Sequence, residues 1–206
     1  MNHSADQLQK SHIHPTAFIE PEVSIGEGAS IWHFVQIRKG ARIGDLVSVG
    51  KDSYIDCNVK IGKGSRIQNQ VNIYDGVTIG DWCFVGPAVV FTNDQFPRVG
   101  NKTRRKIPTI IHHGASIGAG AVIRCGIQIG AFSMVAAGAL VTKDVPPFTL
   151  FLGHPAEGTK RVCACGQSVL PLATSPSEFM RDCCQENMSA ETMELALSEL
   201  RKLIPN

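Results

Sequence analysis

Aliphatic residues recur along this chain at a strict interval of six. Beginning at Ile13, every sixth residue up to Val85 is Ile or Val. Phe91 occupies the next step, after which the pattern stops, and it resumes from Ile111 to Val141. Nineteen hexads are therefore led by a β-branched aliphatic residue. A short period of this kind is typical of solenoid proteins.

Small or short side chains occupy a second repeated position, four residues after each leading aliphatic, as at Ala17, Val35 and Val71. Residues i and i+4 of an extended chain share a face, so both positions point toward one core. Glycines lie between them, as at Gly28 and Gly64, where a turn with positive φ is tolerated. Each hexad therefore predicts a short strand followed by a turn.

A strand and a turn of only six residues cannot pair with themselves, but they can stack on the next turn of a coil. The leading aliphatics then form a continuous stripe, and hydrogen bonds between coils satisfy the backbone. The alternative of a β-sandwich is disfavoured, because sandwich strands repeat every ~8–12 residues with variable loops. We predict an all-β parallel β-helix over residues 13–156.

These hexads resemble those of the hexapeptide-repeat transferases, in which an aliphatic residue is followed by a small or acidic one and, after two variable positions, by another small residue. In that family three hexads form one triangular coil that winds left-handed, an exception to the usual right-handed crossover. The resemblance implies just over six coils. It also implies assembly as a homotrimer, with active sites in the clefts between neighbouring prisms.

The longest interruption of the repeat runs from Thr92 to Ile110 and is rich in basic residues. Long ordered loops in compact domains tend to carry function, and a basic loop can bind anionic substrate or cofactor phosphates. A solvated surface loop is the alternative. We predict that this protruding loop, 92–110, contributes Asp94 and Arg98 to substrate binding. Its other basic residues are Lys102, Arg104, Arg105 and Lys106.

A second departure is the polar stretch 68–75, which includes Gln68, Asn69 and Tyr74. Amides at outward positions can hydrogen-bond a neutral polar ligand such as a sugar or a base. They can equally form a ladder that stabilises successive coils. The sequence leaves both readings open, and we take these three residues as substrate-binding candidates.

Three segments sharpen the resemblance: 67–77, 85–98 and 117–146. Together they are similar to the N-acetyltransferases that modify a nucleotide-linked 3-amino sugar, of the UDP-2-acetamido-3-amino-glucuronate or dTDP-3-amino-3,6-dideoxyhexose type. The turn at 153–156 matches the family's Gly-Asn-Pro-Ala except at His154. The resemblance implies acetyl-CoA as co-substrate, a nucleotide sugar as acceptor, and a role in lipopolysaccharide or other surface-glycan biosynthesis.

Acetyl transfer to an amine requires an aligned amine, a donor for the oxyanion and a route for the departing proton. Family members that act on hydroxyls use a histidine base, but an unprotonated amine needs less help, and the departing thiolate can accept the proton. The family's Phe-Thr-Asn motif corresponds to residues 91–93, which assigns Asn93 to orienting the amine. In the alternative, His112 or His113 at the end of the loop acts as the base on another small acceptor.

Coenzyme A is expected along the later coils. The small residues Gly118, Ala136 and Ala137 would let the pantetheine arm lie close to the backbone. Lys143 and Arg161 could reach the phosphates, although Lys143 can equally be an ordinary turn lysine. No metal is expected in this reaction.

The tail, residues 157–206, has no hexads. Its Cys163-Ala-Cys165 and Cys183-Cys184 pairs offer four sulfurs, which is a weak zinc signal because the strong form has paired C-x-x-C knuckles. Ser189 is predicted to cap a helix that runs to about Ile204. One face of this helix would carry Met193, Leu197, Leu200 and Ile204.

Composition narrows the class of protein. A net charge of +2 and 18% charged residues give no indication of nucleic acid or membrane surfaces as partners. Residues 1–12, expected to be flexible, lack the apolar core of a signal peptide, and no apolar run approaches the ~18 residues of a membrane span. Cys57, Cys83 and Cys125 lie inside the repeats and indicate a reducing compartment, so a cytoplasmic location is expected.

Two further functions were weighed. A γ-class carbonic anhydrase on the same fold needs three zinc histidines with a pair five residues apart, which this chain lacks. A non-catalytic β-helix scaffold subunit is disfavoured by the Phe-Thr-Asn motif and the basic loop.

Overall fold

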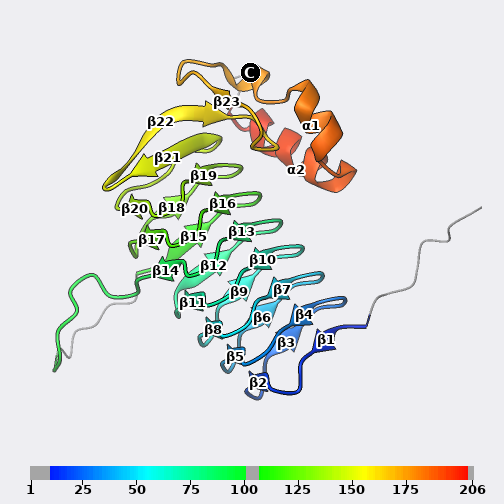
Figure 1. Cartoon of the computed structure of the whole chain (residues 1–206), viewed down its shortest axis with the longest axis vertical. Coiled ribbons are helices and arrows are strands. Elements are labelled where there is room, and N and C mark those ends of the chain that lie inside the picture. The colour runs from blue at the N-terminus through cyan, green and yellow to red at the C-terminus, as the bar shows by residue number, and fades with distance from the viewer. Residues whose placement is uncertain (1–9, 101–106, 204–206) are drawn as a thin grey trace, which may run out of the picture.

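The computed structural model describes residues 10–100 and 107–203, which form a three-sided prism of stacked coils with a cap at its C-terminal end (Figure 1). Most of the predicted flexible N-terminus, residues 1–9, lies outside the described residues. No helix among the residues described is long and apolar enough to cross a membrane.

Three parallel sheets make the three faces of the prism. Face A contains β1 (His12–Ile13), β4 (Ser30–Ile31), β7 (Ser48–Val49), β10 (Arg66–Ile67), β13 (Phe84–Val85), β16 (Ser116–Ile117) and β19 (Met134–Val135). Face B contains β2 (Phe18–Ile19), β5 (Gln36–Ile37), β8 (Tyr54–Ile55), β11 (Asn72–Ile73), β14 (Val90–Phe91), β17 (Val122–Ile123) and β20 (Leu140–Val141). Face C contains β3 (Ser24–Ile25), β6 (Arg42–Ile43), β9 (Lys60–Ile61), β12 (Val77–Ile79), β15 (Thr109–Ile111) and β18 (Gln128–Ile129).

The leading aliphatics stack in register from one coil to the next, as Ile37 on Ile55 and Ile55 on Ile73. From Ile31 onward their side chains are buried and fill the interior of the prism, whereas Ile19 and Ile25 are half-buried and Ile13 is exposed at the open N-terminal end. Backbone groups bond between coils, as when the N–H of Gly44 donates to the carbonyl of Ile61 over 2.8 Å. The predicted all-β left-handed parallel β-helix is confirmed, as is its interruption after Phe91.

The chain turns between faces at three corners, and we name each by the faces it joins: corner AB, corner BC and corner CA. The third residue after most leading aliphatics takes a positive φ, at glycine in about half of these turns and otherwise at residues such as Leu46 (58°) and Trp82 (55°). Two features make glycine necessary at position 64. Its φ is 67°, and a Cβ there would lie 2.4 Å from the ring of Trp82 in the next coil.

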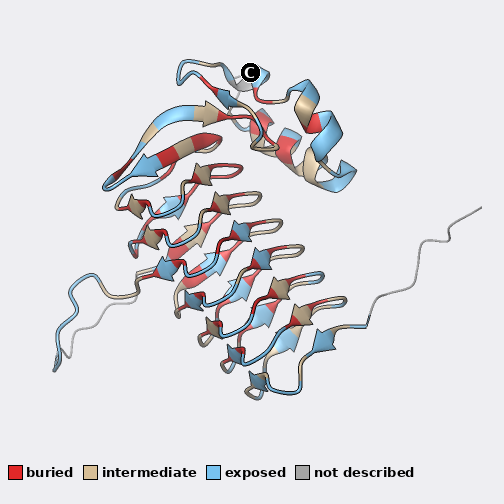
Figure 2. Cartoon of the chain, viewed as in Figure 1, coloured by how far each residue is buried: buried red, intermediate tan, exposed pale blue. Residues whose placement is uncertain are grey.

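The cap continues face A with the antiparallel strands β21 (Thr149–Gly153), β22 (Ala156–Val162) and β23 (Val169–Leu170). It then adds a 3-10 turn (Pro176–Glu178) and helices α1 (Asp182–Asn187) and α2 (Ala190–Arg201). Figure 2 shows buried segments extending from the prism into the cap. A stack of Phe132, Phe148 and Phe179, with centroid spacings of 5.5 and 5.1 Å, joins the two. The cap therefore closes the open end of the solenoid core, as terminal repeats must.

Helix α2 begins as predicted, with Ser189 Oγ accepting the N–H of Thr192 at 3.2 Å. It ends at Arg201, earlier than expected. The predicted apolar face is wrong at Leu197, which is 39% exposed. The buried stripe instead runs through Ala196 and Leu200, where the small alanine lets the helix approach the cap core closely.

Candidate functional site

The predicted site residues lie along two different corners of the prism. Gln68, Asn69, Gly118, Ala136 and Ala137 all follow strands of face A, so they line corner AB. Hydrogen bonds between coils connect this edge, including the N–H of Gln68 to Val85 and the N–H of Gly118 to Val135. The two amides predicted to bind substrate and the three small residues predicted to bind coenzyme A thus lie along the same edge of the molecule.

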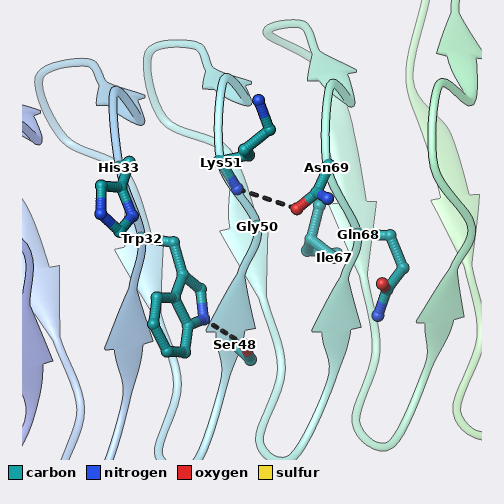
Figure 3. Close-up of a pocket in the computed structure, with 8 residues that line it drawn as sticks. All are labelled: Trp32, His33, Ser48, Gly50, Lys51, Ile67, Gln68 and Asn69. Atoms are coloured by element: carbon teal, nitrogen blue, oxygen red, sulfur yellow. Dashed lines mark hydrogen bonds between the residues drawn. The ribbon is translucent and has the colours of Figure 1, made fainter.

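The lower half of corner AB is a hollow of about 210 Å³ beside Trp32, Lys51, Gln68 and Asn69 (Figure 3). The side-chain Oδ1 of Asn69 accepts the backbone N–H of Lys51 at 3.1 Å, so this amide stabilises successive coils. The Gln68 carboxamide makes no hydrogen bond within the described residues. Gln68 therefore keeps its whole carboxamide available to a ligand, whereas Asn69 keeps only its side-chain nitrogen.

The upper half of corner AB is lined by small residues. A Cβ on Gly118 would lie 2.4 Å from the backbone nitrogen of Ala137, so the stacking of these coils requires glycine there. Ala136 is half-buried and Ala137 is exposed. With so little side-chain bulk, this edge presents backbone that a slender ligand can approach closely.

Tyr74, Asn93, Asp94 and Lys143 follow strands of face B and lie along corner BC. The inserted loop leaves the prism here and carries Arg98, which is exposed (Figure 1). Its basic residues Lys102, Arg104, Arg105 and Lys106 lie outside the described residues.

Asn93 stands at the base of the inserted loop. Its neighbour Thr92 holds this base in place, because the Thr92 Oγ1 accepts the N–H of Cys125 in the next coil at 2.9 Å. Asn93 itself is half-buried, and its carboxamide has no hydrogen-bond partner among the described residues. The scaffold therefore fixes the backbone of Asn93 and leaves its polar group unused.

A polar network below the loop escaped the sequence analysis. The Arg38 guanidinium donates to Glu20 at 2.5 Å and to the Tyr54 hydroxyl at 3.0 Å. The Tyr54 hydroxyl in turn donates to Asp56 at 3.1 Å. The Tyr54 ring also lies 6.1 Å from that of Tyr74. The network thus runs along corner BC up to a predicted substrate-binding residue.

Both carboxylates of this network are charged at neutral pH. The backbone N–H of Lys39, together with Arg38, holds the pKa of Glu20 below its ordinary value. Burial raises the pKa of Asp56, but hydrogen bonds from the backbone N–H groups of Cys57 and Asp75 outweigh burial and leave it lowered. Corner BC therefore carries fixed charge of both signs next to the loop.

Two residues predicted to bind coenzyme phosphates have partners within the chain. Lys143 pairs with Glu157 at 2.5 Å, at an exposed position. Arg161 lies in β22, where it donates to Thr149 Oγ1 and to the Pro147 carbonyl and sits 6.0 Å from the centre of the Phe179 ring. Arg161 therefore holds the cap together, and the geometry within one chain favours that structural role.

His112 and His113 lie at corner CA, across face C from Asn93. His112 Nε2 is 2.9 Å from the side-chain oxygen of Gln128. His113 Nδ1 accepts the backbone N–H of Asp81 at 2.9 Å. Within one chain, neither histidine is brought together with the candidate residues of corner BC.

Comparison with known proteins places these features in a family. Residues 58–93 match the model of the bacterial transferase hexapeptide (six repeats), and residues 108–143 match the hexapeptide repeat of succinyl-transferase. The chain is 42% identical to a dTDP-3-amino-3,6-dideoxy-alpha-D-galactopyranose 3-N-acetyltransferase of Aneurinibacillus thermoaerophilus, over 74% of this chain and 79% of that protein.

More distant relatives share smaller parts. The bifunctional protein GlmU of Thermotoga maritima is 30% identical over 69% of this chain but only 28% of its own length. The solved structure of PerB from Caulobacter crescentus, in complex with CoA and GDP-perosamine, is 26% identical, covers 73% of this chain and 57% of its own, and has a TM-score of 0.42. Because its hexads match the two hexapeptide models and it is 42% identical to the Aneurinibacillus enzyme, the chain belongs to the hexapeptide-repeat acyltransferases. Within them it belongs to the subfamily of nucleotide-linked 3-amino-sugar N-acetyltransferases.

Proposed function

We propose that this enzyme transfers the acetyl group of acetyl-CoA to the amino group of a nucleotide-linked 3-amino sugar. The observation that carries the proposal is Asn93, a half-buried amide without a partner in the described chain, at the corner where the loop leaves the prism. The reaction named for the Aneurinibacillus relative agrees with it.

In the proposed step, the amine nitrogen attacks the thioester carbonyl carbon. The new C–N bond forms as the C–S bond breaks, and the proton of the amine passes to the departing thiolate, giving free coenzyme A. The Asn93 side-chain oxygen accepts a hydrogen bond from the amine and aims its lone pair at the carbonyl. Because the leaving group takes the proton, no protein base is required.

The substrates would occupy the two corners described above. Pantetheine would lie along Gly118, Ala136 and Ala137 at corner AB, with Lys143 of a corner BC near its phosphates, whereas Arg161 is engaged inside the cap. The nucleotide sugar would contact a second set of residues, drawn from both corners. This second set is Gln68, Asn69, Tyr74, Asp94 and Arg98.

Face B separates these two corners within one chain, so the two sets of residues can meet only in a site shared between neighbouring protomers. The hollow of about 210 Å³ at corner AB is smaller than the ~300–1,000 Å³ of typical ligand pockets. A neighbouring protomer that presents its corner BC to corner AB would enlarge the hollow and unite the two sets of residues. We infer that the enzyme is a homotrimer with three sites between protomers.

The assembly has a direct test. We expect a mass of about 67 kDa, three times the 22.2 kDa of the chain, by light scattering coupled to size exclusion at micromolar concentration. A monomer under these conditions would contradict the shared site, because a single prism keeps the two sets of residues apart on corners AB and BC.

The activity is tested by following free thiol with acetyl-CoA and a panel of nucleotide-linked amino sugars, including dTDP-3-amino-3,6-dideoxyhexoses and UDP-2-acetamido-3-amino-glucuronate. Thiol release with 3-amino sugars, and none with the matched 3-hydroxy sugars, is expected. Release with hydroxyl acceptors alone would favour a histidine-based acyltransferase. If calorimetry detects no binding of acetyl-CoA, the chain is instead a scaffold subunit.

A further inference from the structure

The four cysteines of the tail converge on one point in the cap. Cys163 and Cys165 follow β22, and Cys183 and Cys184 lie in α1. All four sulfur atoms lie within 4.8 Å of one another, and none is in a disulfide. Segments about twenty residues apart in sequence have therefore been folded so that their thiols meet.

The spacing of these sulfurs fits a tetrahedral metal site. The Sγ atoms of Cys163, Cys165 and Cys183 are 3.5, 3.6 and 3.7 Å apart. Four thiolates at ~2.3 Å from a zinc ion would be separated by about 3.8 Å, the edge of the tetrahedron. Disulfide sulfurs would be ~2.05 Å apart. These three sulfurs thus have the spacing of a tetrathiolate site, and the Sγ of Cys184 completes the set within 4.8 Å of each of them.

The surrounding backbone is arranged to support thiolates. The N–H of Ser168 points at Cys163 Sγ over 3.1 Å, and the N–H of Arg181 points at Cys184 Sγ over 3.5 Å. Donors of this kind orient metal-bound sulfurs and stabilise their negative charge. Cys163 and Cys184 are fully buried, and the other two sulfurs are partly covered.

Two other cysteines of the chain lie apart from any second thiol and serve only as core residues. Cys83 and Cys125 are buried singly inside the coils, as small hydrophobic residues. In the sequence the tail cysteines are only a weak zinc signal, because their spacing is C-x-C and C-C. In the fold, one pair comes from the turn after β22 and the other from α1, and the two elements pack so that the four sulfurs meet.

We propose that Cys163, Cys165, Cys183 and Cys184 together bind one zinc ion, which fastens the turn after β22 to α1 within the cap. A site with four protein ligands leaves no open coordination position, so its role is structural and separate from acetyl transfer. Cys163 and Cys184 belong to the same apolar cluster as Phe132 and Phe148 of the last coil. The ion would therefore hold the turn after β22 and α1 together, beside the apolar cluster that covers the last coil.

The test is the metal content of the purified full-length protein by plasma mass spectrometry, where about one zinc per chain is expected. Cys163→Ser and Cys184→Ser should each lower the zinc content at least tenfold, whereas Cys125→Ser, a buried cysteine outside the cluster, should retain it. Protein produced with cobalt in place of zinc should show thiolate-to-cobalt charge transfer and intense tetrahedral d–d bands. The cobalt spectrum decides the question even if a serine variant does not fold.

Three results would overturn the proposal. The first is wild-type protein that holds no zinc after growth with added zinc. The second is a pair of disulfides among the four cysteines, detected by mass spectrometry without reduction. The third is zinc that survives Cys163→Ser with no thiolate band in the cobalt protein, which would place the metal elsewhere, for example at the stacked His14 and His33.

Discussion

Asn93→Ala is expected to lower kcat/KM roughly 10- to 1000-fold, mostly through kcat, while the proposed trimer stays intact. The amide that we propose holds the amine in line is lost, and alanine cannot replace its acceptor oxygen. Stability should change little, because the Asn93 side chain has no hydrogen bond within the described chain to lose. Steady-state thiol release measures the rate, and light scattering checks the assembly.

Three variants serve as comparisons for Asn93→Ala. Arg98→Ala should raise KM for the sugar nucleotide or for the coenzyme with little change in kcat, because an exposed cation contributes to binding both ground and transition states. His112→Ala and His113→Ala should each have smaller effects than Asn93→Ala. If a histidine variant abolishes activity while Asn93→Ala is nearly silent, a protein base operates and the assignment of Asn93 is wrong.

The prism could be predicted from the sequence because the residues that specify each strand and turn lie next to one another in the chain. Each hexad contains its own strand, turn and inward residue, so the six-residue step from Ile13 to Val141 is enough to identify the coils. The corners were less readable. Positive φ is tolerated at Leu46 and Trp82, residues that would not be chosen for a turn, because stacking on the coils above and below determines the backbone there.

The candidate site could be read only in part, because it depends on contacts between coils. Glu20, Arg38, Asp56 and Tyr74 follow one another at steps of eighteen residues, so they stack along corner BC. Consecutive hexads lie at different corners of the prism, so a search with a six-residue period does not reveal that these four residues lie above one another. For the same reason Gln68 lies near Tyr74 in the sequence, although face B separates them in the fold.

The cap was the least predictable part, because its contacts join residues far apart in sequence. Lys63 of the coil pairs with Glu191 of α2 across 128 positions. Phe148 lies just beyond the last regular hexad and gives no periodic signal, yet it is fully buried between Phe132 and Phe179. Such packing becomes visible only once the fold brings the tail back over the last coil.

Phe148→Ala should therefore reduce the free energy of unfolding by about 3–5 kcal/mol, the usual cost of removing a buried phenylalanine. The ring is the middle member of the stack that joins the last coil to the cap, so its loss leaves a cavity between them. In a solenoid each unit is stabilised by its neighbours, and a loosened cap exposes the end of the core. Urea denaturation at fixed protein concentration measures the change.

Phe96→Ala is the matched control for Phe148→Ala, since Phe96 is 73% exposed on the inserted loop. Its free energy of unfolding should stay within about 0.5 kcal/mol of wild type. Hydrogen exchange adds a local measurement: Phe148→Ala should speed exchange in β21 and β22 more than in β5 or β8, because the damage lies at one end of the prism. Equal stability of the two variants, or uniform loss of protection along the coils, would show that the cap does not stabilise the end of the solenoid.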